Sequence, residues 1–247
     1  MFSQFCFYVL LYYFGACLGS FLYCLAGQWV HQSFHWDSRS SCDRCGHQLH
    51  WYELLPIFSF VLSRRKCRFC QSPIAWGYIL SETGTSLLFG TMGFLLYNSF
   101  STSLSIYYLM VFSLLLLMSF CDLQDRWVPD VLQICLLLVI AFYRGHLGMD
   151  QPFYFTYALS FSLLLGLLYL IAPHWIGGAD IKLLAILSFA VPPLSVPYLL
   201  FTASFSAFLY LAVVSLIFRK QLIHLPFIPF ISLSFYIVGI ILTHFNF

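Results

Sequence analysis

The stretch MFSQFCFYVLLYYFGACLGSFLYCLAGQWV, residues 1–30, is apolar and contains no charged side chain. An apolar run of roughly 20 residues is long enough to cross a bilayer as an α-helix, which satisfies its own backbone hydrogen bonds. The stretch is too long for a removable signal peptide, and it lacks both a charged start and a small-residue cleavage site. We therefore predict a retained membrane span.

The composition of the whole chain extends this prediction. Of the 247 residues, 61% are hydrophobic and only 8% are charged, whereas roughly a quarter of the residues in a soluble domain are charged. Seven more apolar runs follow, at 74–98, 104–121, 129–146, 152–172, 180–191, 195–218 and 226–246. We predict an all-α polytopic membrane protein with about eight transmembrane helices. Pro192 and Pro193 interrupt the apolar sequence after the short sixth run, which favours a hairpin or a kink within one longer element.

The basic residues orient these spans. If the N-terminus lies outside, the inside loops contain all of the 11 lysines and arginines except Arg144. Cytoplasmic loops of membrane proteins carry an excess of Lys and Arg. The pattern predicts an outside N-terminus, whereas the overall charge of +2 is uninformative about orientation.

One segment, residues 31–73, is polar and contains two CxxC pairs, CDRC at 42–45 and CRFC at 67–70. Each pair presents two thiolates, and four thiolates complete a closed tetrahedral zinc site. We predict that Cys42, Cys45, Cys67 and Cys70 bind a structural Zn²⁺ in a small cytoplasmic loop domain. The alternatives are two disulfides or idle thiols, of which a cytoplasmic location disfavours the first. A further alternative is that His47 or His50 replaces one cysteine.

These features divide the chain into three predicted regions. Residues 1–30 form the first span, residues 31–73 the zinc-binding loop, and residues 74–247 a membrane-embedded domain. The cysteines outside the loop lie in or at the ends of spans, where small apolar packing is their ordinary role.

Acidic residues are informative because the chain has only nine of them, and a carboxylate within a span is costly. Asp122, Asp125, Asp130 and Asp180 fall at the inner ends of predicted spans. Asp130 follows Pro129 and starts a helix, where the helix dipole stabilises its charge. Asp122 closes a helix, where the dipole and nearby hydrocarbon disfavour its charge. Asp180 opens one after Gly177 and Gly178, whose backbone permits close approach of a substrate.

Two carboxylates in opposed environments form a candidate acid and base pair. In aspartic proteolysis, one carboxylate takes a proton from water while the other protonates the peptide carbonyl, so the peptidase step requires no metal. We assign Asp180 as the initial base and Asp122 as the acid, although paired aspartates titrate as a unit. A proton relay in a transporter is an equally plausible interpretation of the residues alone.

The motifs resemble those of the type IV prepilin peptidases, a family of membrane aspartic proteases with a GxGD signature that also act as N-methyltransferases. GACLGSFLYCLA (15–26) resembles the family's first-span motif, and residues 42–89 resemble its zinc loop and following span, including Glu82. CDLQDRWVPD (121–130) resembles the segment of the first catalytic aspartate, Asp122. GGADIKLLA (177–185) resembles the GxGD segment with the second, Asp180. LPFIPFISL (225–233) is similar to the proline-rich start of the last span.

Two departures from the family pattern stand out. Ala179 replaces the glycine immediately before the second aspartate, which is tolerable unless the backbone there needs a positive φ. The family's usual proline after the first span is absent from HQSFHWDSRSS (31–41), which concerns the geometry of the loop.

The resemblance implies the activity and its partners. The substrates would be type IV prepilins or pseudopilins, cut at the cytoplasmic membrane boundary after a short basic leader. The new N-terminus would be methylated with S-adenosylmethionine, and the cytoplasmic loop would contain the methyltransferase site. The protein would lie in a bacterial inner or plasma membrane, with the lipid bilayer as partner and no role in nucleic-acid binding.

Other residues near these motifs have supporting roles in this prediction. Gly177, Gly178, Ala179 and Lys182 flank Asp180, and Asp125 is available for leader recognition or is a solvated loop charge. Glu82 contributes to the methyltransferase site, helps to place the aspartates, or forms a structural hydrogen bond to a neighbouring helix. Gly84 and the small hydroxylated residues of SETGTS (81–86) would allow close helix contact there. His174 is interpreted as an interfacial, solvated histidine. The rival functions are a zinc-stabilised transporter and a non-catalytic secretion scaffold in which Ala179 disables the site.

Overall fold

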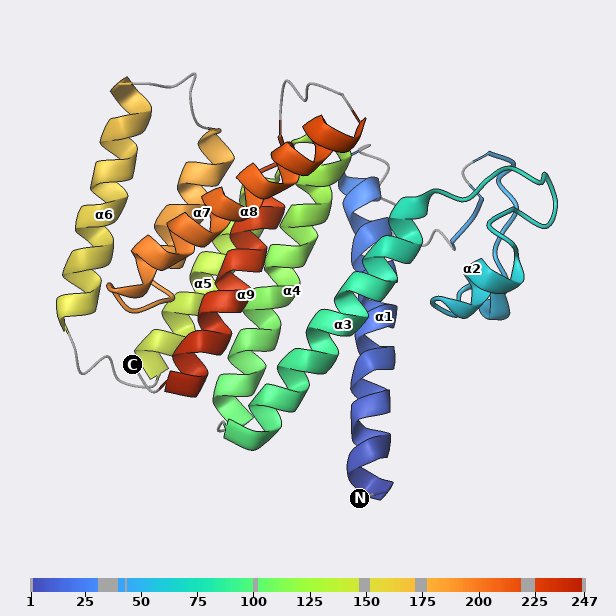
Figure 1. Cartoon of the computed structure of the whole chain (residues 1–247), viewed down its shortest axis with the longest axis horizontal. Helices are drawn as coiled ribbons and strands as arrows, with labels where there is room; N and C mark the ends of the chain where they lie inside the picture. Colours follow the sequence, from blue (N-terminus) through green and yellow to red (C-terminus); the bar gives the residue numbers. More distant parts are fainter. Residues whose placement is uncertain are drawn as a thin grey trace. The chain divides into compact units, whose positions relative to one another are not determined.

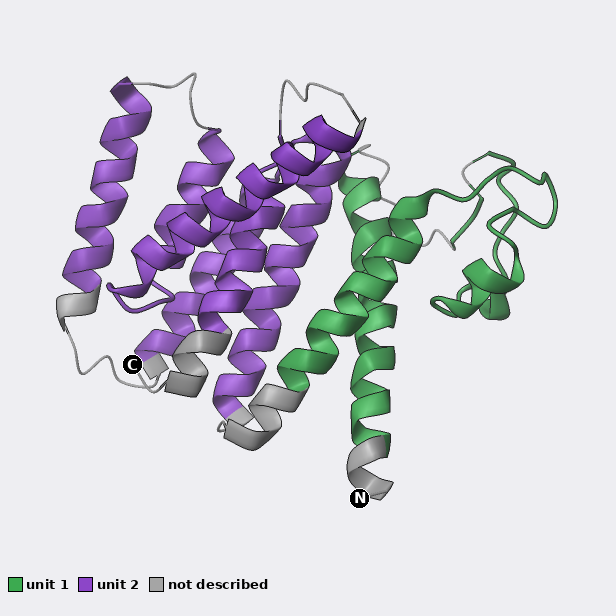
Figure 2. Ribbon diagram, in the orientation of Figure 1, with its two compact units in different colours: residues 1–100 green, residues 101–247 purple. Residues whose placement is uncertain are grey.

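The computed structural model describes residues 2–30, 40–42, 44–99, 102–146, 152–171, 177–218 and 225–245. Each of the predicted apolar runs forms an α-helix, and in these ranges the only β-structure is two isolated bridges. The prediction of an all-α protein is therefore confirmed. The chain forms two compact units, residues 1–100 and residues 101–247 (Figure 2).

The first unit contains two long helices and the cysteine-containing loop between them. Helix α1 spans Phe2–Val30 and α3 spans Trp76–Ser99, and the two pack against each other (Figure 1). The loop carries a single 3-10 turn, η1 (Trp51–Glu53), and a short helix, α2 (Phe58–Leu62).

Helices α1 and α3 approach closely because two glycines one turn apart face α3. A Cβ at Gly15 would lie 2.8 Å from the Cβ of Phe89, and a Cβ at Gly19 would overlap the Thr85 hydroxyl oxygen. The hydroxyl of Thr85 donates a hydrogen bond to the Gly15 carbonyl at 2.8 Å. Small residues spaced four apart are a common basis for close helix contact in membranes.

The prediction of close contact at Gly84 and its hydroxylated neighbours is confirmed for the hydroxylated residues and wrong for Gly84. A Cβ at Gly84 would meet no atom within 4 Å. Gly84 lies on α3, but the face of α3 that meets α1 carries Thr85 and Ser86 instead. The hydroxyl of Ser86 donates to the Tyr12 carbonyl at 2.8 Å.

The described residues of the second unit form a bundle of six helices. They are α4 (Thr102–Asp125), α5 (Asp130–His146), α6 (Pro152–Ile171), α7 (Gly178–Ser188), α8 (Ser195–Phe218) and α9 (Ile228–Phe245). Helix α4 packs against α5 and α9, α7 packs against α5 and α6, and α8 packs against α9 (Figure 1). Fully buried Phe112, Leu115 and Met118 of α4 and Phe235 of α9 form part of the core.

The proline pair separates two helices rather than kinking one. Helix α7 ends at Ser188 and α8 begins at Ser195, with Pro192 and Pro193 in the turn between them. The carbonyls of these two prolines accept hydrogen bonds from the backbone N–H groups of Ser195 and Val196. The alternative of a kink within one longer element is therefore wrong.

Three helices in the described part of the chain are long and apolar enough to cross a membrane, over Cys6–Val30, Ser103–Asp125 and Ser195–Ile217. The shorter apolar helices cover Phe155–Ile171 and Ile228–Gly239. Large apolar side chains such as Leu170 and Leu216 are exposed on these helices, as lipid-facing positions require. The total of eight spans stays a prediction.

Candidate active site and metal centre

Asp122 lies one turn before the end of α4, with only 7% of its surface exposed. Its Oδ2 accepts a hydrogen bond from the backbone N–H of Ile228 at 3.1 Å. Ile228 is the first residue of α9 and is fully buried. The first N–H groups of a helix have no partner within that helix, so the Asp122 carboxylate caps the start of α9.

Further polar contacts fix α4 against α9 beside this carboxylate. The hydroxyls of Ser119 and Ser232 lie 2.8 Å apart, and the Ser232 hydroxyl lies 3.3 Å from the Leu115 carbonyl oxygen. Ser119 is three residues before Asp122 and Ser232 is four residues after Ile228, so these residues share the facing sides of the two helices. The start of α9 is thus part of the aspartate site, although the sequence prediction named no residue there. The hint available in the sequence is the proline-rich stretch LPFIPFISL.

Asp180 lies in the first turn of α7, three residues after the N-cap Gly177. A Cβ on Gly177 would lie 2.8 Å from Oδ2 of Asp180, so the carboxylate folds back over the glycine. Gly177 has φ −61° and ψ 135°, which any residue can adopt. The glycine is therefore needed for space and not for a left-handed backbone.

Ala179 does not disturb this turn. It lies within the first turn of α7, and its φ is not positive. Gly178 has a neighbour in α6, because a Cβ there would lie 3.4 Å from the Tyr169 hydroxyl. Replacement of a family glycine by alanine at 179 is sterically accommodated.

The structure brings the two predicted aspartates together. Asp122 lies close enough to Asp180 to act on it electrostatically. Helix α5 packs against both α4 and α7, and the side chain of Gln133 on α5 donates a hydrogen bond to the Ala179 carbonyl at 3.2 Å. Gln133 is a residue that the sequence prediction missed, because an amide inside an apolar helix gives no signal of its partner.

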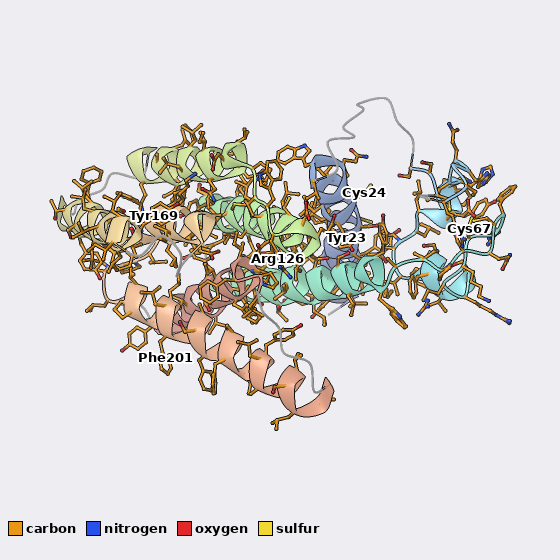
Figure 3. All side chains as sticks on the ribbon, turned by 90° about the horizontal axis from the view of Figure 1, so that it is seen from above. Tyr23, Cys24, Cys67, Arg126, Tyr169 and Phe201 are labelled. Atoms are coloured by element: carbon orange, nitrogen blue, oxygen red, sulfur yellow. The ribbon has the colours of Figure 1, made fainter. Side chains whose placement is uncertain are left out.

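The charged residues close in sequence to Asp122 and Asp180 do not form ion pairs with these two aspartates within the described residues. Lys182 forms an ion pair with Asp130 on α5 at 2.7 Å, and both side chains are more than half exposed. Asp125, the last residue of α4, is exposed and forms no ion pair within the described residues. Arg126 follows it with φ 53° (labelled in Figure 3), which reverses the chain after α4.

The four predicted cysteine ligands form one cluster in the loop of the first unit, where Figure 3 labels Cys67. All four Sγ atoms lie within 4.8 Å of one another, with 3.8 Å between Cys42 and Cys70 and 3.9 Å between Cys45 and Cys67. Sulfurs bound at about 2.3 Å to a tetrahedral zinc lie about 3.8 Å apart. The cluster could therefore hold a metal ion of this kind, and the thiols are free rather than disulfide-bonded.

The two CxxC pairs form equivalent turns. The N–H of Gly46 donates to the Cys42 carbonyl at 2.9 Å, and the N–H of Gln71 donates to the Cys67 carbonyl at 3.0 Å. Gly46 has φ 69° and Gln71 has φ 57°. The second turn therefore places a glutamine in the left-handed region that the first turn fills with glycine.

Local hydrogen bonds favour the thiolate at two cysteines of this cluster, whereas desolvation and the neighbouring thiols raise the pKa of Cys45 to about 11. Hydrogen bonds from the backbone of Arg44 and Cys45 lower the pKa of the Cys42 thiol to about 6. The hydroxyl and backbone of Ser72 lower the pKa of Cys70. Metal ligation requires the thiolate form, so these contacts prepare the site for a cation.

The remaining predicted residues have structural partners. His47 packs on Phe69 with 3.6 Å between ring centroids, and His50 is the N-cap of η1, so neither joins the cysteine cluster. Oε2 of Glu82, a residue that is 6% exposed, accepts a hydrogen bond at 2.7 Å from the backbone N–H of Ile57. Glu82 thus links the cysteine-containing loop to α3. His174 and residues 31–39 lie outside the described residues.

Comparison with known proteins agrees with this site. Residues 13–96 match the Bacterial Peptidase A24 N-terminal domain, and residues 109–212 match the Type IV leader peptidase family. The prepilin leader peptidase/N-methyltransferase of Bacillus subtilis is 32% identical over 195 residues, which cover 74% of this chain and 73% of that protein. The protein of the same name from Vibrio cholerae is 27% identical over 221 residues, covering 82% and 81%.

A third relative is the type 4 prepilin-like proteins leader peptide-processing enzyme of Escherichia coli, which is 27% identical over 209 residues, covering 79% of this chain and 73% of that enzyme. No solved structure matches the chain. The two matched regions include both the cysteine cluster and the two aspartates. From its matched domains and relatives, the chain belongs to the type IV leader peptidase family.

Proposed function

We propose that this protein is a membrane-embedded aspartic endopeptidase that removes the short basic leader of type IV prepilins or pseudopilins. The observation that supports this most directly is the proximity of Asp122 on α4 and Asp180 on α7. Two carboxylates within electrostatic range can share one proton and act as an acid and base pair. The names of the relatives supply the substrate class.

In this mechanism Asp180 accepts a proton from water, and the resulting hydroxide attacks the scissile carbonyl. Asp122 protonates the carbonyl oxygen, which gives a tetrahedral diol. Asp180 then passes its proton to the amide nitrogen while Asp122 takes a proton back from the diol, and the C–N bond breaks to release the new amine and the carboxyl group. Oδ2 of Asp122 already accepts the Ile228 N–H, so the proton that Asp122 donates is carried by Oδ1. Because the two carboxyl groups interact, their apparent pKa values belong to the pair and not to either aspartate alone.

The experiment is cleavage of a purified prepilin by the full-length protein in lipid nanodiscs. Asp122→Asn and Asp180→Asn each keep the side-chain shape, and we expect either to lower kcat at least about 10³-fold. Asp130→Asn is the matched control, because Asp130 is exposed and pairs with Lys182, and we expect nearly full activity. Cleavage at the normal rate by either of the first two variants would disprove the assignment.

The same assay separates the rival functions. If Ala179 disabled the site, the unmutated protein would bind prepilin without cutting it, and Ala179→Gly would restore cleavage. Because Ala179 lies in a helical turn without positive φ, we expect both forms to cut at similar rates. A transporter would instead show ion-coupled uptake in proteoliposomes without any cleavage.

We further propose that Asp125 contributes to recognition of the basic leader. It is the exposed carboxylate at the end of α4, one turn from Asp122, and within the described residues it has no ion-pair partner. We expect Asp125→Lys to raise the KM for a prepilin, and reversal of the leader charges to restore part of that loss. An unchanged KM with both substrates would show that Asp125 is only a solvated charge.

We propose that the cysteine cluster binds a structural Zn²⁺, with all four thiolates as ligands. Its support is the spacing of the four Sγ atoms and the low pKa of Cys42. Protein purified without a metal-affinity tag should contain about one zinc per chain, and Cys67→Ser should lose it while the control Cys6→Ser should keep it. Folded protein without metal would contradict the zinc proposal and leave the peptidase proposal intact.

We propose the N-methyltransferase activity from the names of the relatives. S-adenosylmethionine would supply the methyl group for the new N-terminal amine. The described residues identify no binding site for this cofactor, so we assign no residue to the transfer. Mass measurement of the cleaved pilin with and without S-adenosylmethionine tests this activity separately, since a shift of one methyl group appears only if it is present.

We also propose that the protein lies in the bacterial inner membrane with its N-terminus outside, and with residues 1–30, 31–73 and 74–247 as first span, zinc loop and peptidase domain. If successive helices alternate in direction across the bilayer, the loop, the end of α4 and the starts of α7 and α9 would lie on the cytoplasmic side, and the excess of basic residues in these segments supports this orientation. A membrane-impermeant thiol reagent should therefore fail to label a cysteine introduced at Arg64 in intact cells. Labelling from outside would show that the loop lies outside and that the proposed orientation is wrong.

A further inference from the structure

Gln133 is an amide buried in the apolar helix α5, one turn from its start, with only 3% of its surface exposed. Its Nε2 donates to the Ala179 carbonyl at 3.2 Å. Its Oε1 is buried and has no hydrogen-bond partner among the described groups. A buried polar atom without a partner lowers stability, so Gln133 is not explained by packing.

The bond to Ala179 acts on the peptide group that also contains the nitrogen of Asp180. A peptide group is planar, so a hydrogen bond to its carbonyl fixes the plane from which Asp180 projects. The two residues that precede Ala179 are glycines and have no side chain with which to hold the turn. The Gln133 amide is therefore a specific restraint on the backbone beside Asp180.

A second polar contact joins α5 and α7, but it is an exposed ion pair and not a buried hydrogen bond. Lys182 and Asp130 form an exposed ion pair, and exposed pairs of this type contribute little because water and salt screen them. Gln133 and Asp130 are three residues apart on α5, and Ala179 and Lys182 are three residues apart on α7. Of these two links, the buried one is next to the carboxylate.

We propose that Gln133 is a positioning residue that holds the Ala179–Asp180 peptide group and thereby orients the Asp180 carboxylate toward Asp122. This inference rests on the proposed catalytic role of the two aspartates. It explains why the fold keeps an amide where a leucine of similar size would avoid an unsatisfied oxygen. Replacement by an apolar side chain should therefore reduce turnover without reducing stability.

The test uses the full-length protein in nanodiscs with a purified prepilin. For Gln133→Leu we expect kcat to fall by about 10- to 100-fold, because small misplacements of a catalytic group have effects of this size. KM should stay unchanged, and the unfolding temperature should stay equal or rise. A merely structural role predicts a lower unfolding temperature and normal turnover per folded molecule, which would overturn the proposal.

Hydrogen exchange supplies a direct readout of the backbone. In Gln133→Leu, the amides of residues 178–181 should exchange faster than in the unmutated protein, whereas those at the other end of α7 should not change. A reduced kcat with unaltered exchange in both segments would also overturn positioning through Ala179. Gln133→Met, an unbranched side chain of similar length, provides the same comparison if the leucine variant does not fold.

Two controls separate this inference from the function on which it rests. Asp130→Asn removes the neighbouring ion pair and should leave kcat within about twofold. If Asp180→Asn cleaves normally, the proposed catalytic pair itself fails. If Asp180→Asn is inactive while Gln133→Leu has normal kcat, the aspartate assignment holds and the positioning role is wrong.

Discussion

Substitution of Gly19 by alanine should weaken the contact between α1 and α3. The new methyl group would overlap the Thr85 hydroxyl oxygen and would lie 2.7 Å from the Ser81 carbonyl oxygen. The carbonyl belongs to the backbone of α3 and cannot rotate away. The two helices would therefore have to separate, which would weaken the hydrogen bonds from Thr85 to Gly15 and from Ser86 to Tyr12.

The size of the effect follows from three contributions. Inserting a methyl group into a close contact costs about 1–3 kcal/mol, and each interhelical hydrogen bond in a membrane contributes about 0.6 kcal/mol. Alanine offsets about 1 kcal/mol of this through its higher helix propensity. We expect a net loss of about 1–3 kcal/mol in the free energy of unfolding, given the ranges above.

The matched control is Gly84→Ala on the partner helix α3, where a Cβ would meet no described atom within 4 Å. Because only helix propensity acts there, we expect a change between zero and about 1 kcal/mol in the stabilising direction. Unfolding of both variants in mixed micelles, followed by circular dichroism as the denaturing detergent is increased, measures the difference. Equal stability of the two variants would falsify the close-contact explanation.

Three further predictions concern single contacts. Ile228→Pro removes the N–H that binds Asp122, and proline is tolerated in the first turn of a helix. We expect kcat/KM for prepilin cleavage to fall at least about tenfold below that of the control Ile228→Ala. Equal values for the two variants would exclude a role for this N–H. Gln71→Gly removes the steric strain of a side chain at φ 57°. The unfolding temperature of the protein with zinc added should rise or stay unchanged, and a decrease would contradict the strain argument. Glu82→Leu removes the acceptor for the Ile57 N–H and should speed trypsin cleavage of the loop, whereas an unchanged rate would mean that this bond does not anchor it.

The cysteine cluster and the two aspartates could be predicted, because closely spaced cysteines and rare carboxylates stand out in the sequence without knowledge of the fold. Two CxxC pairs define a metal site almost independently of the rest of the fold, since each pair needs only one tight turn. Asp122 and Asp180 are conspicuous because carboxylates are rare and costly in an apolar chain. The structure adds that both turns share one geometry and that Lys182 pairs with Asp130 rather than with its neighbour Asp180.

The partners of these residues could not be predicted. Gln133 contacts a residue 46 positions away, and Asp122 contacts an N–H 106 positions away. In a helix that is apolar on most sides, the sequence gives little indication of which face meets which neighbour. The error about Gly84 has the same origin, since a glycine in an apolar helix indicates a possible close contact but not its direction.

The sequence by itself determined the all-α fold, the approximate helix bounds, the grouping of the four cysteines and the choice of the candidate aspartate pair. Apolar length, turn-forming spacing and the cost of charge all act within a few residues of chain, so they can be read without knowing the fold. The tertiary structure alone decided that Asp122 caps α9, that Gln133 of α5 contacts the turn of Asp180, and that Gly15 and Gly19 allow close approach of α3. Such contacts depend on shape and hydrogen bonding between helices of similar hydrophobicity.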